Sequence, residues 1–206
     1  IVAATLAGLL LILFAVSEGI MLSSFSRLEV KDTSKNVERA LGALSDDISS
    51  LVTMTRDWAV WDDTYNFIEN GNKEYIEANP TDAEFESLRV NVMLFINSSG
   101  QIVYSEAFDL EQEQEVPVPQ SLLGLISPES IIVQHPDTES SVSGIILLPE
   151  GPMLIASQPI LTSQNQGPIR GALIWGRYLN PAEIGGLAET THLSLTVQRL
   201  DESQMT

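Results

Sequence analysis

The organisation of the chain can be worked out from one short stretch, Asp57-Trp58-Ala59-Val60-Trp61-Asp62-Asp63-Thr64-Tyr65, which holds two of its three tryptophans. On an α-helix, at about 100° per residue, four of these side chains fall within about a third of a turn: Trp58, Trp61, Asp62 and Tyr65. Aromatic rings alone could simply close a core. A carboxylate on a core-facing stripe, however, is costly unless it is hydrogen-bonded, paired or used for a ligand. Asp62 therefore makes this face a candidate binding site.

An apolar stripe leads up to this stretch. Its members step by four and three along the chain: Val37, Leu41, Leu44, Ile48 and Leu51. The same step continues through Thr55 to Trp58 and Asp62, which predicts an amphipathic helix over residues 23–68 that stops near Asn70-Gly71. A strict heptad favours pairing with a second copy in a left-handed coil, so we expect a homodimer through residues 34–55. Packing of the stripe along a sheet of the same chain is an equal alternative.

The beginning of the chain is almost uninterruptedly apolar, and its first charge is Glu18. Its length approaches the roughly 20 residues that cross a bilayer core, which predicts a transmembrane helix over residues 1–22, continuous with a long amphipathic helix over 23–56. A signal peptide is the alternative, but its apolar region is shorter. Cytoplasmic flanks are enriched in Lys and Arg, whereas the polypeptide after this helix carries nearly all of a net charge of −18. We therefore expect a cell-membrane protein whose residues after about 22 are extracellular or periplasmic.

Composition excludes several classes of function. The chain has 206 residues, 44% of them hydrophobic, which is enough for one ordinary domain with its own core. Acidic residues accumulate between Arg89 and Arg170, where there is no Lys or Arg. Nucleic acid is excluded as a partner because its binding needs a basic footprint, and a solvating acidic surface explains most of these charges. The lack of cysteine excludes disulfides, thiol catalysis and Cys-ligated metal.

The second half of the sequence predicts strands. Residues 91–104 form a hairpin around the turn Asn97-Ser98-Ser99-Gly100, which also matches a glycosylation acceptor pattern. A second hairpin is expected over residues 144–160, a further strand over 169–178, and a last strand over 193–200. Helices are expected over 73–78, 83–88 and 121–126 and after the capping residue Asn180. Hairpin-linked strands with helices set to one side predict an α+β domain on an antiparallel sheet.

Catalytic groups are not evident. The histidines, His135 and His192, stand apart from any Ser-His-Asp spacing, and the sequence has no phosphate loop or His-based metal motif. Asp62 and Asp63 cannot face one ligand from adjacent helical positions, so a glycosidase pair is unsupported. We expect no catalysis, cofactor or metal site in this chain.

Three blocks carry a family resemblance: the Asp57–Tyr65 stretch, the residue 91–104 hairpin, and the run Ala156-Ser157-Gln158-Pro159-Ile160-Leu161-Thr162-Ser163 followed by Gly167-Pro168-Ile169-Arg170-Gly171-Ala172-Leu173 and Gly176-Arg177. In this order they resemble the fourth family of CHASE domains, extracellular sensory domains associated with cyclases and histidine kinases. The resemblance covers about residues 44–179. It implies a Cache-like or PAS-like fold held outside the cell between two membrane helices, here with a sensor domain over 57–200 and, at 201–206, the start of a link to a second membrane helix. The output domain, a histidine kinase or cyclase, would lie outside this chain.

A binding module fits these observations better than an enzyme, because small-ligand sites are mostly apolar clefts with a few convergent polar groups. We expect an unknown small molecule to bind the Trp58–Tyr65 face against strands that bear Arg89, Asn91, Arg170 and Arg177. A cationic ligand would favour the aromatic rings and an anionic one the arginines. Arg170 could equally form a structural ion pair with Asp62 or another acid. The alternative function is a membrane-anchored structural or adhesion module without a small ligand.

Overall fold

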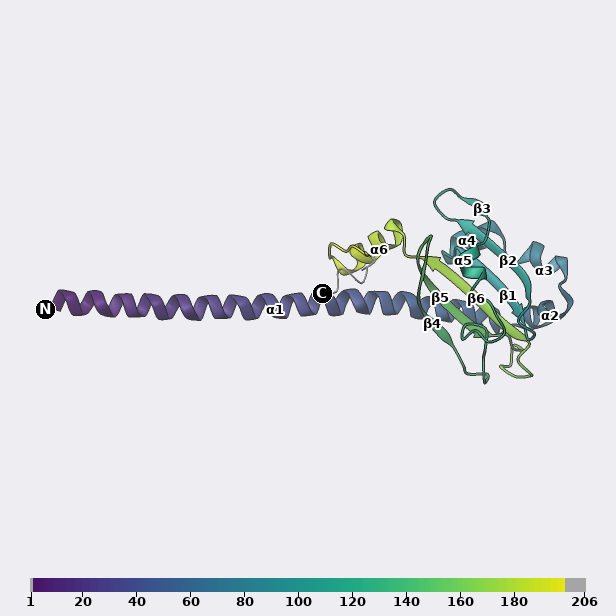
Figure 1. Ribbon diagram of the computed structural model, residues 1–206, viewed down its shortest axis with the longest axis horizontal. Coiled ribbons are helices and arrows are strands. Elements are labelled where there is room, and N and C mark those ends of the chain that lie inside the picture. The colour runs from purple at the N-terminus through teal and green to yellow at the C-terminus, as the bar shows by residue number, and fades with distance from the viewer. Residues whose placement is uncertain (1, 199–206) are drawn as a thin grey trace.

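A long N-terminal helix and an antiparallel sheet organise the chain (Figure 1). The computed structural model describes residues 2–198, and for most residues before Lys31 it describes the backbone alone. Its helices are α1 (Val2–Ala59), α2 (Asp62–Asn70), α3 (Lys73–Ala78), α4 (Asp82–Leu88), α5 (Gln120–Leu123) and α6 (Pro181–Thr191). Its strands are β1 (Val92–Asn97), β2 (Ile102–Asp109), β3 (Gln114–Val116), β4 (Val142–Leu148), β5 (Gly151–Pro159) and β6 (Gly171–Tyr178).

Across residues 2–198 the six strands form one antiparallel sheet in the order β3-β2-β1-β6-β5-β4. The predicted hairpins are confirmed as β1-β2 and β4-β5, and the central pair β1-β6 sets Phe95 opposite Leu173. Sequence analysis did not predict β3, which arises from the acidic segment after β2 and pairs Val116 with Ala107. The predicted α+β class with an antiparallel sheet is confirmed.

The sheet is apolar on both faces because successive side chains of a strand point to opposite sides. One face, with Phe95, Leu154 and Trp175 among its residues, packs against α1, α2 and α3. The other face belongs to a second core that includes Leu94 and Ile155 and is covered by α5 and the segment from 116 to 142. The two cores place α1 on one side of the sheet and irregular connections on the other.

The apolar stripe of α1 changes its environment along the helix. Leu51 and Thr55 are fully buried under the sheet, and Ile48 packs partly buried against the same core. Farther towards the N-terminus, Val37 and Leu41 are 53% and 61% exposed. The stripe therefore packs along its own sheet in its second half, which was one of the two alternatives, and dimerisation through this helix stays a prediction.

The predicted continuous helix over 23–68 is wrong, because the helix is interrupted within the Asp57–Tyr65 stretch. Helix α1 ends at Ala59, whose carbonyl oxygen accepts a hydrogen bond from the Leu161 backbone N–H at 3.0 Å. Val60 forms a parallel bridge with Leu161, and Trp61 is extended with φ −141° and ψ 133°. Backbone pairing with the segment after β5 thus overrides the helical spacing, and the four residues of the expected face do not lie on one helix.

The predicted strand over 193–200 is also wrong for its described part, because residues 193–198 have no regular secondary structure. His192 ends α6 in the left-handed conformation and turns the chain there. Both edges of β6 are already occupied by β1 and β5, so the returning chain has no place beside it. Residues 199 and 200, and the expected link at 201–206, lie outside the described residues.

A transmembrane helix is expected over residues 1–22, and most of the side chains in this range lie outside the described part of the chain. Among the residues that the structure describes, no helix combines the length and the hydropathy needed to cross a membrane.

Candidate functional site

The tryptophans of the Asp57–Tyr65 stretch are partly buried and pack against the core. Trp58 meets Trp175 edge to face, with ring centroids 5.3 Å apart, and Trp61 lies 6.0 Å from Tyr75. Such aromatic pairs add stability beyond their buried area. The indole N–H of Trp175 is buried without a hydrogen-bond partner among the described residues. These rings stabilise the turn from α1 into α2.

Asp62 does not face the core, contrary to expectation, but is exposed at the first residue of α2. Its backbone N–H donates to Ser163 Oγ at 3.0 Å, and its Oδ1 accepts from the Ser163 backbone N–H at 3.0 Å. The carboxylate also lies at a helix N-terminus, where negative charge is favourable. Asp62 thus attaches the loop after β5 to the start of α2.

Tyr65 and Arg170 are the two predicted site residues that contact each other most closely. The Arg170 guanidinium carbon lies 3.7 Å from the centroid of the Tyr65 ring, and Nη1 donates to the Tyr65 carbonyl oxygen at 2.7 Å. Arg170 Nε pairs with Glu69 at 2.9 Å, and the Tyr65 hydroxyl donates to the Pro168 carbonyl oxygen at 3.2 Å. Arg170 therefore forms the structural ion pair named as an alternative, with Glu69 as its acid.

Arg177 lies at the other end of β6 from Arg170. Seven residues of strand, at about 3.3 Å each, separate the two arginines by roughly 23 Å, so one small ligand cannot contact both. The buried Arg177 pairs with Asp47 of α1 and donates to the carbonyl oxygens of Leu88 and Arg89. Arg177 therefore connects the end of β6 to α1 and to the end of α4.

Asn91 and Arg89 lie near that same end of the sheet. The buried Asn91 amide donates to the Phe108 carbonyl oxygen at 3.0 Å and accepts from the Tyr178 backbone N–H at 2.9 Å. Arg89 ends α4 in the left-handed conformation, and its side chain pairs with Glu183 of α6. The structure thus distributes the predicted site residues over separate places, and among them only Asn91 lines the cavity described next.

A cavity of about 770 Å³ lies where β1 begins and β2, β3 and β6 end. Its floor includes the buried Val92 and Ala107, and the turn from β4 to β5 and the segment 116–120 complete the wall. Leu179, Asn180 and Pro181, which lead into α6, also line it. The volume falls within the range typical of small-molecule sites, and Figure 1 shows α6 leaving this end of the sheet to run beside α1. The cavity is therefore the candidate functional site.

The charged side chains of the cavity lining are all acidic: Asp109, Glu111 and Glu150. Each of these carboxylates accepts hydrogen bonds from neutral groups. Asp109 accepts from the Glu111 and Gln112 backbone N–H groups, Glu111 Oε1 accepts from Asn180 Nδ2 at 3.0 Å, and Glu150 Oε2 accepts from the Ser121 hydroxyl at 2.6 Å. Burial, followed by the charge of Glu150, raises the pKa of Tyr178 in the same lining. The rim is thus negative, and no Lys or Arg of the described residues contributes to it.

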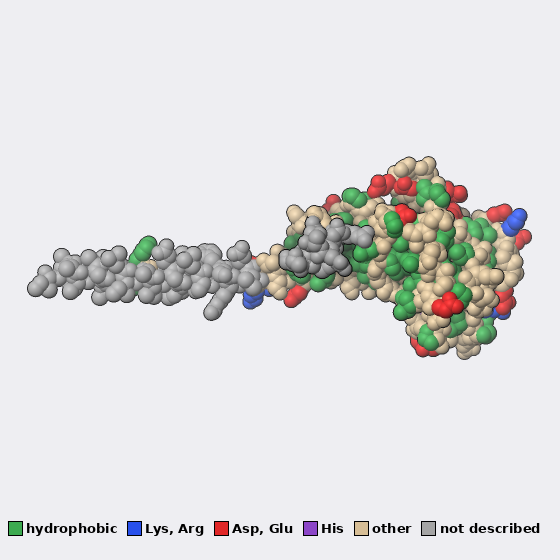
Figure 2. Space-filling view, in the orientation of Figure 1, with side chains coloured by type: hydrophobic (Ala, Val, Ile, Leu, Met, Phe, Trp, Pro, Cys, Tyr) green, Lys and Arg blue, Asp and Glu red, His purple; other side chains and the backbone are tan. Residues whose placement is uncertain are grey.

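Sequence analysis missed these acids. The signal was present as the excess of acidic over basic residues between Arg89 and Arg170, but it was attributed to a solvating surface. Figure 2 shows carboxylates at several places on the surface of the domain, as expected for acidic residues that are in contact with solvent. The three cavity acids could not be separated from the others without knowing which strand ends meet.

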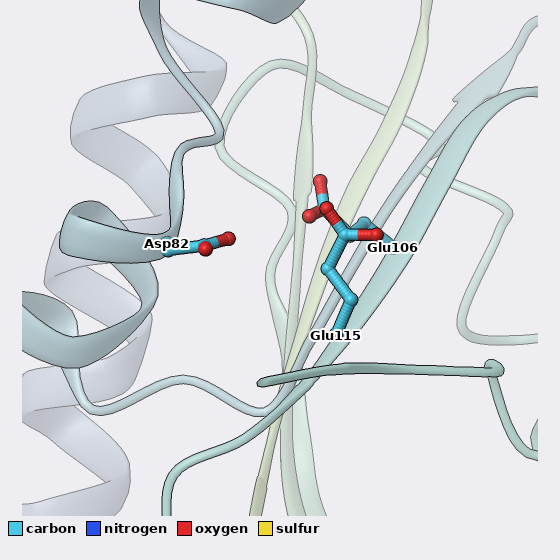
Figure 3. Close-up of side chains that lie close together, drawn as sticks. All are labelled: Asp82, Glu106 and Glu115. Carbon is cyan, nitrogen blue, oxygen red and sulfur yellow. The ribbon is translucent and has the colours of Figure 1, made fainter. Parts of the chain in front are cut away.

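A second acidic group consists of Asp82 on α4, Glu106 on β2 and Glu115 on β3, whose carboxylates point toward one another (Figure 3). One oxygen of each lies within 4.8 Å of the others. Burial raises the pKa of Glu106, a hydrogen bond from the Tyr104 hydroxyl lowers it, and the neighbouring carboxylates raise it further. Oxygen donors of this kind suit a hard divalent cation, but exposed acidic groups are common without one.

The two histidines have structural surroundings. His135 lies between the hydroxyls of Ser140 and Ser157, at 3.0 and 2.9 Å from its ring nitrogens. Burial lowers its pKa to about 4, against a smaller opposing effect of Asp137. His192 ends α6. Neither histidine lines the cavity.

Among solved structures, the chain is similar to the extracellular domain of the histidine kinase vpHK1S-Z8, with a TM-score of 0.52, 14% sequence identity, and coverage of 77% of this chain and 61% of that one. A domain of a sensory box/GGDEF family protein from Vibrio parahaemolyticus is similar at a TM-score of 0.45 and 13% identity, over 75% of this chain and 64% of that one. The similarity to the vpHK1S-Z8 domain shows that the two chains share a fold.

The chain belongs to the CHASE4 domain family, which matches residues 43–198. This confirms the resemblance drawn from the sequence. A curated relative, the methanogenesis regulatory histidine kinase FilI of Methanothrix harundinacea (strain 6Ac), is 36% identical over 175 residues. The alignment covers 85% of this chain and 20% of that kinase, so the chain spans about a fifth of the relative's length.

Proposed function

We propose that this chain is the ligand-sensing input domain of a membrane-bound signalling receptor, a histidine kinase or a diguanylate cyclase whose output domain lies outside it. Membership of the CHASE4 family and the relation to a histidine kinase support this proposal. The observation that carries it is the position of the cavity, whose lining includes the residues that lead into α6.

The ligand site in this proposal is the cavity rather than the Trp58–Tyr65 face, because the polar groups of that face are engaged within the chain. Asp62 is bound to Ser163, and Arg170 is bound to Glu69 and to the Tyr65 backbone. The cavity combines an apolar lining with carboxylates, and those of Glu111 and Glu150, like that of Asp62, each accept a single hydrogen bond among those of the described residues. An ionised carboxylate has about four acceptor positions, so both can also bind a ligand.

The route to the output passes through α6. Asn180 is the N-cap of α6: its Oδ1 accepts from the Glu183 backbone N–H at 2.9 Å, and its Nδ2 donates to Glu111 in the cavity lining. A ligand that binds Glu111 acts directly on this cap. Helix α6 packs on α1, and Arg39 of α1 donates to the Thr191 carbonyl oxygen at 3.4 Å. A ligand that favours one placement of α6 shifts the population by its differential affinity for the two placements.

In the same proposal residues 1–22 form the membrane anchor, 23–56 the signalling and dimerisation helix, and 57–200 the sensor domain outside the cytoplasm. The long apolar run and the acidity of the remainder support this arrangement. The test is a cysteine introduced at Ser99, at the tip of the β1-β2 turn, in oriented membranes. It should react with a membrane-impermeant reagent from the outside, and labelling only from the cytoplasmic side would contradict the orientation.

Dimerisation is proposed through the exposed start of the α1 stripe, Val37 and Leu41. Replacing both by Lys should weaken self-association, measured by sedimentation of the full chain in detergent, without changing the fold. The same substitutions at the buried Leu51 would instead unfold the domain. An unchanged dimer in the Val37→Lys/Leu41→Lys variant would place the interface elsewhere.

The ligand-sensing role is tested by a thermal-shift screen of small metabolites on the full chain. Val118→Trp, in the cavity wall, fills the site, and Leu125→Trp, at an exposed position outside the lining, is the matched control. Compounds that stabilise the wild type and the control should fail to stabilise Val118→Trp. If a compound stabilises the wild type and both variants equally, the ligand site is not in the cavity. A structural or adhesion module, the alternative function, would be stabilised by no compound.

A further inference from the structure

We propose that the cavity at the end of the sheet binds a small organic cation, an ammonium group carried on an apolar body. This inference rests on the proposed sensing function and names its ligand class.

The charge of the cavity lining favours a cation. The lining carries Asp109, Glu111 and Glu150 and, among the described residues, no Lys or Arg. Neutral donors hold these carboxylates, so no side-chain cation offsets their charge. The chain as a whole carries a net charge of −18, which repels anions at long range and attracts cations. An anionic ligand would have to enter a negative cavity without a positive partner.

The cavity is apolar at its floor and charged at its rim. The buried Val92 and Ala107, with the partly buried Val116 and Val118, form an apolar floor, while Glu111 and Glu150 are exposed at the rim. Tyr178 belongs to the same lining and is half-buried. An aromatic face attracts an ammonium group in addition to the carboxylates. A molecule with an apolar body and a cationic head therefore satisfies both parts of the site.

The spacing of the cavity acids favours an organic cation over a bare metal ion. Among the described residues, Asp82, Glu106 and Glu115 are the one group of three acidic or histidine side chains whose ligand atoms come within 4.8 Å of one another, and they lie outside the cavity. The cavity acids are more widely spread than this. A hard divalent cation needs several oxygen ligands at about 2.0 to 2.6 Å, whereas an ammonium on an organic body can pair with one carboxylate and place its remainder on the apolar floor.

The experiment uses three probes with one apolar body and three charges: benzylammonium, benzyl alcohol and benzoate. Their binding to the full chain is measured by calorimetric titration at low salt. The variants are Glu150→Gln and Glu111→Gln, which keep the side-chain shape, with the exposed Glu129→Gln outside the cavity as the matched control and Val118→Trp as the filled cavity. Circular dichroism verifies that each variant is folded.

Benzylammonium should bind at least about tenfold more tightly than the other two probes, because charge complementarity discriminates between ligands of one shape. Glu150→Gln or Glu111→Gln should remove most of that preference, Glu129→Gln should keep it, and added salt should weaken it. If benzyl alcohol or benzoate binds as tightly as benzylammonium and Val118→Trp abolishes the binding, the cation assignment is wrong while the cavity stays a ligand site. If no probe binds, or if Val118→Trp binds like the wild type, the cavity itself is refuted as the site and the proposed function loses the observation that carries it.

Discussion

Arg177 and Asp47 form an ion pair, 2.5 Å between Nη1 and Oδ1, that joins the central strand β6 to the long helix α1. The Arg177 side chain is only 3% exposed, and its remaining donors reach the carbonyl oxygens of Leu88 and Arg89. Three elements, α1, β6 and the end of α4, therefore meet at one guanidinium group. The pair fixes the position of α1 over the end of the sheet that holds the cavity.

Asp47→Asn should destabilise the domain by about 3 kcal/mol, because removing one partner leaves a buried charge uncompensated. Arg177→Lys should also be less stable than the wild type, since an ammonium group cannot reproduce the fork of donors that reaches two carbonyl oxygens. Urea unfolding monitored by tryptophan fluorescence measures both. The exposed Asp46→Asn is the control and should change the free energy of unfolding by less than about 0.5 kcal/mol. A loss below about 1 kcal/mol in Asp47→Asn would show that the pair contributes little.

Gly171→Ala should destabilise the sheet by more than about 2 kcal/mol, because a Cβ at this position would lie 1.9 Å from the Ile96 carbonyl oxygen and the central β1-β6 pair would have to move apart. Gly185→Ala is the contrasting variant. Gly185 lies inside α6 with no atom within 4 Å of an added Cβ, so alanine should stabilise the chain by up to about 1 kcal/mol. Thermal unfolding of the two variants should shift in opposite directions. A stabilised Gly171→Ala would contradict the described strand register.

His135 should make the domain less stable as the pH falls. Its pKa is lowered from 6.5 to about 4 by burial, so the unfolded chain binds more protons than the native one between these values. The stabilisation is complete above pH 6.5 and is lost as the pH falls towards 4. After allowance for the partly exposed ring, the loss should be on the order of 1 kcal/mol. Comparison of melting temperatures across this range with His135→Gln isolates the effect, and parallel curves for the two proteins would rule it out.

Glu106 should act in the opposite direction. Burial and the neighbouring carboxylates raise its pKa above 4.5, so the native state holds the proton more tightly, and the cost of ionising Glu106 is relieved as the pH falls through the raised pKa. Glu106→Gln should therefore raise the melting temperature at pH 7 to 8, and this gain should vanish below about pH 4.5. Glu86→Gln, on the exposed side of α4, is the control. A gain that is the same at all pH values would exclude repulsion among the three carboxylates as its cause.

Sequence periodicity predicted the elements whose hydrogen bonds are local. The helices over 73–78 and after Asn180 and the two hairpins follow from capping residues, turns and alternation. The break at Ala59 could not be predicted this way, because it depends on Leu161, which is distant in the sequence. Because the helix ends there, Trp58, Trp61 and Asp62 do not form one helical face.

The candidate site was harder still to predict. Its acidic residues come from the end of β2, the β4-β5 turn and the loop before β3, which are brought together only by the order of the strands. Asp62 and Arg170 interrupt apolar patterns of the sequence, yet each binds another residue of the chain, Ser163 and Glu69 respectively. A charge that interrupts a pattern indicates that it has a partner, and the partner can be another residue of the same chain.

The central claim, that the cavity is the ligand site and acts on α6, is tested most directly by hydrogen–deuterium exchange of the full chain with and without the benzyl probe that binds best. The account predicts slower exchange in residues 107–120 and 149–152 and a change at 179–184, where the lining leads into α6. Residues 58–65 and 163–170 should exchange at unchanged rates. Protection confined to those two segments, with none around the cavity or at the start of α6, would contradict the account.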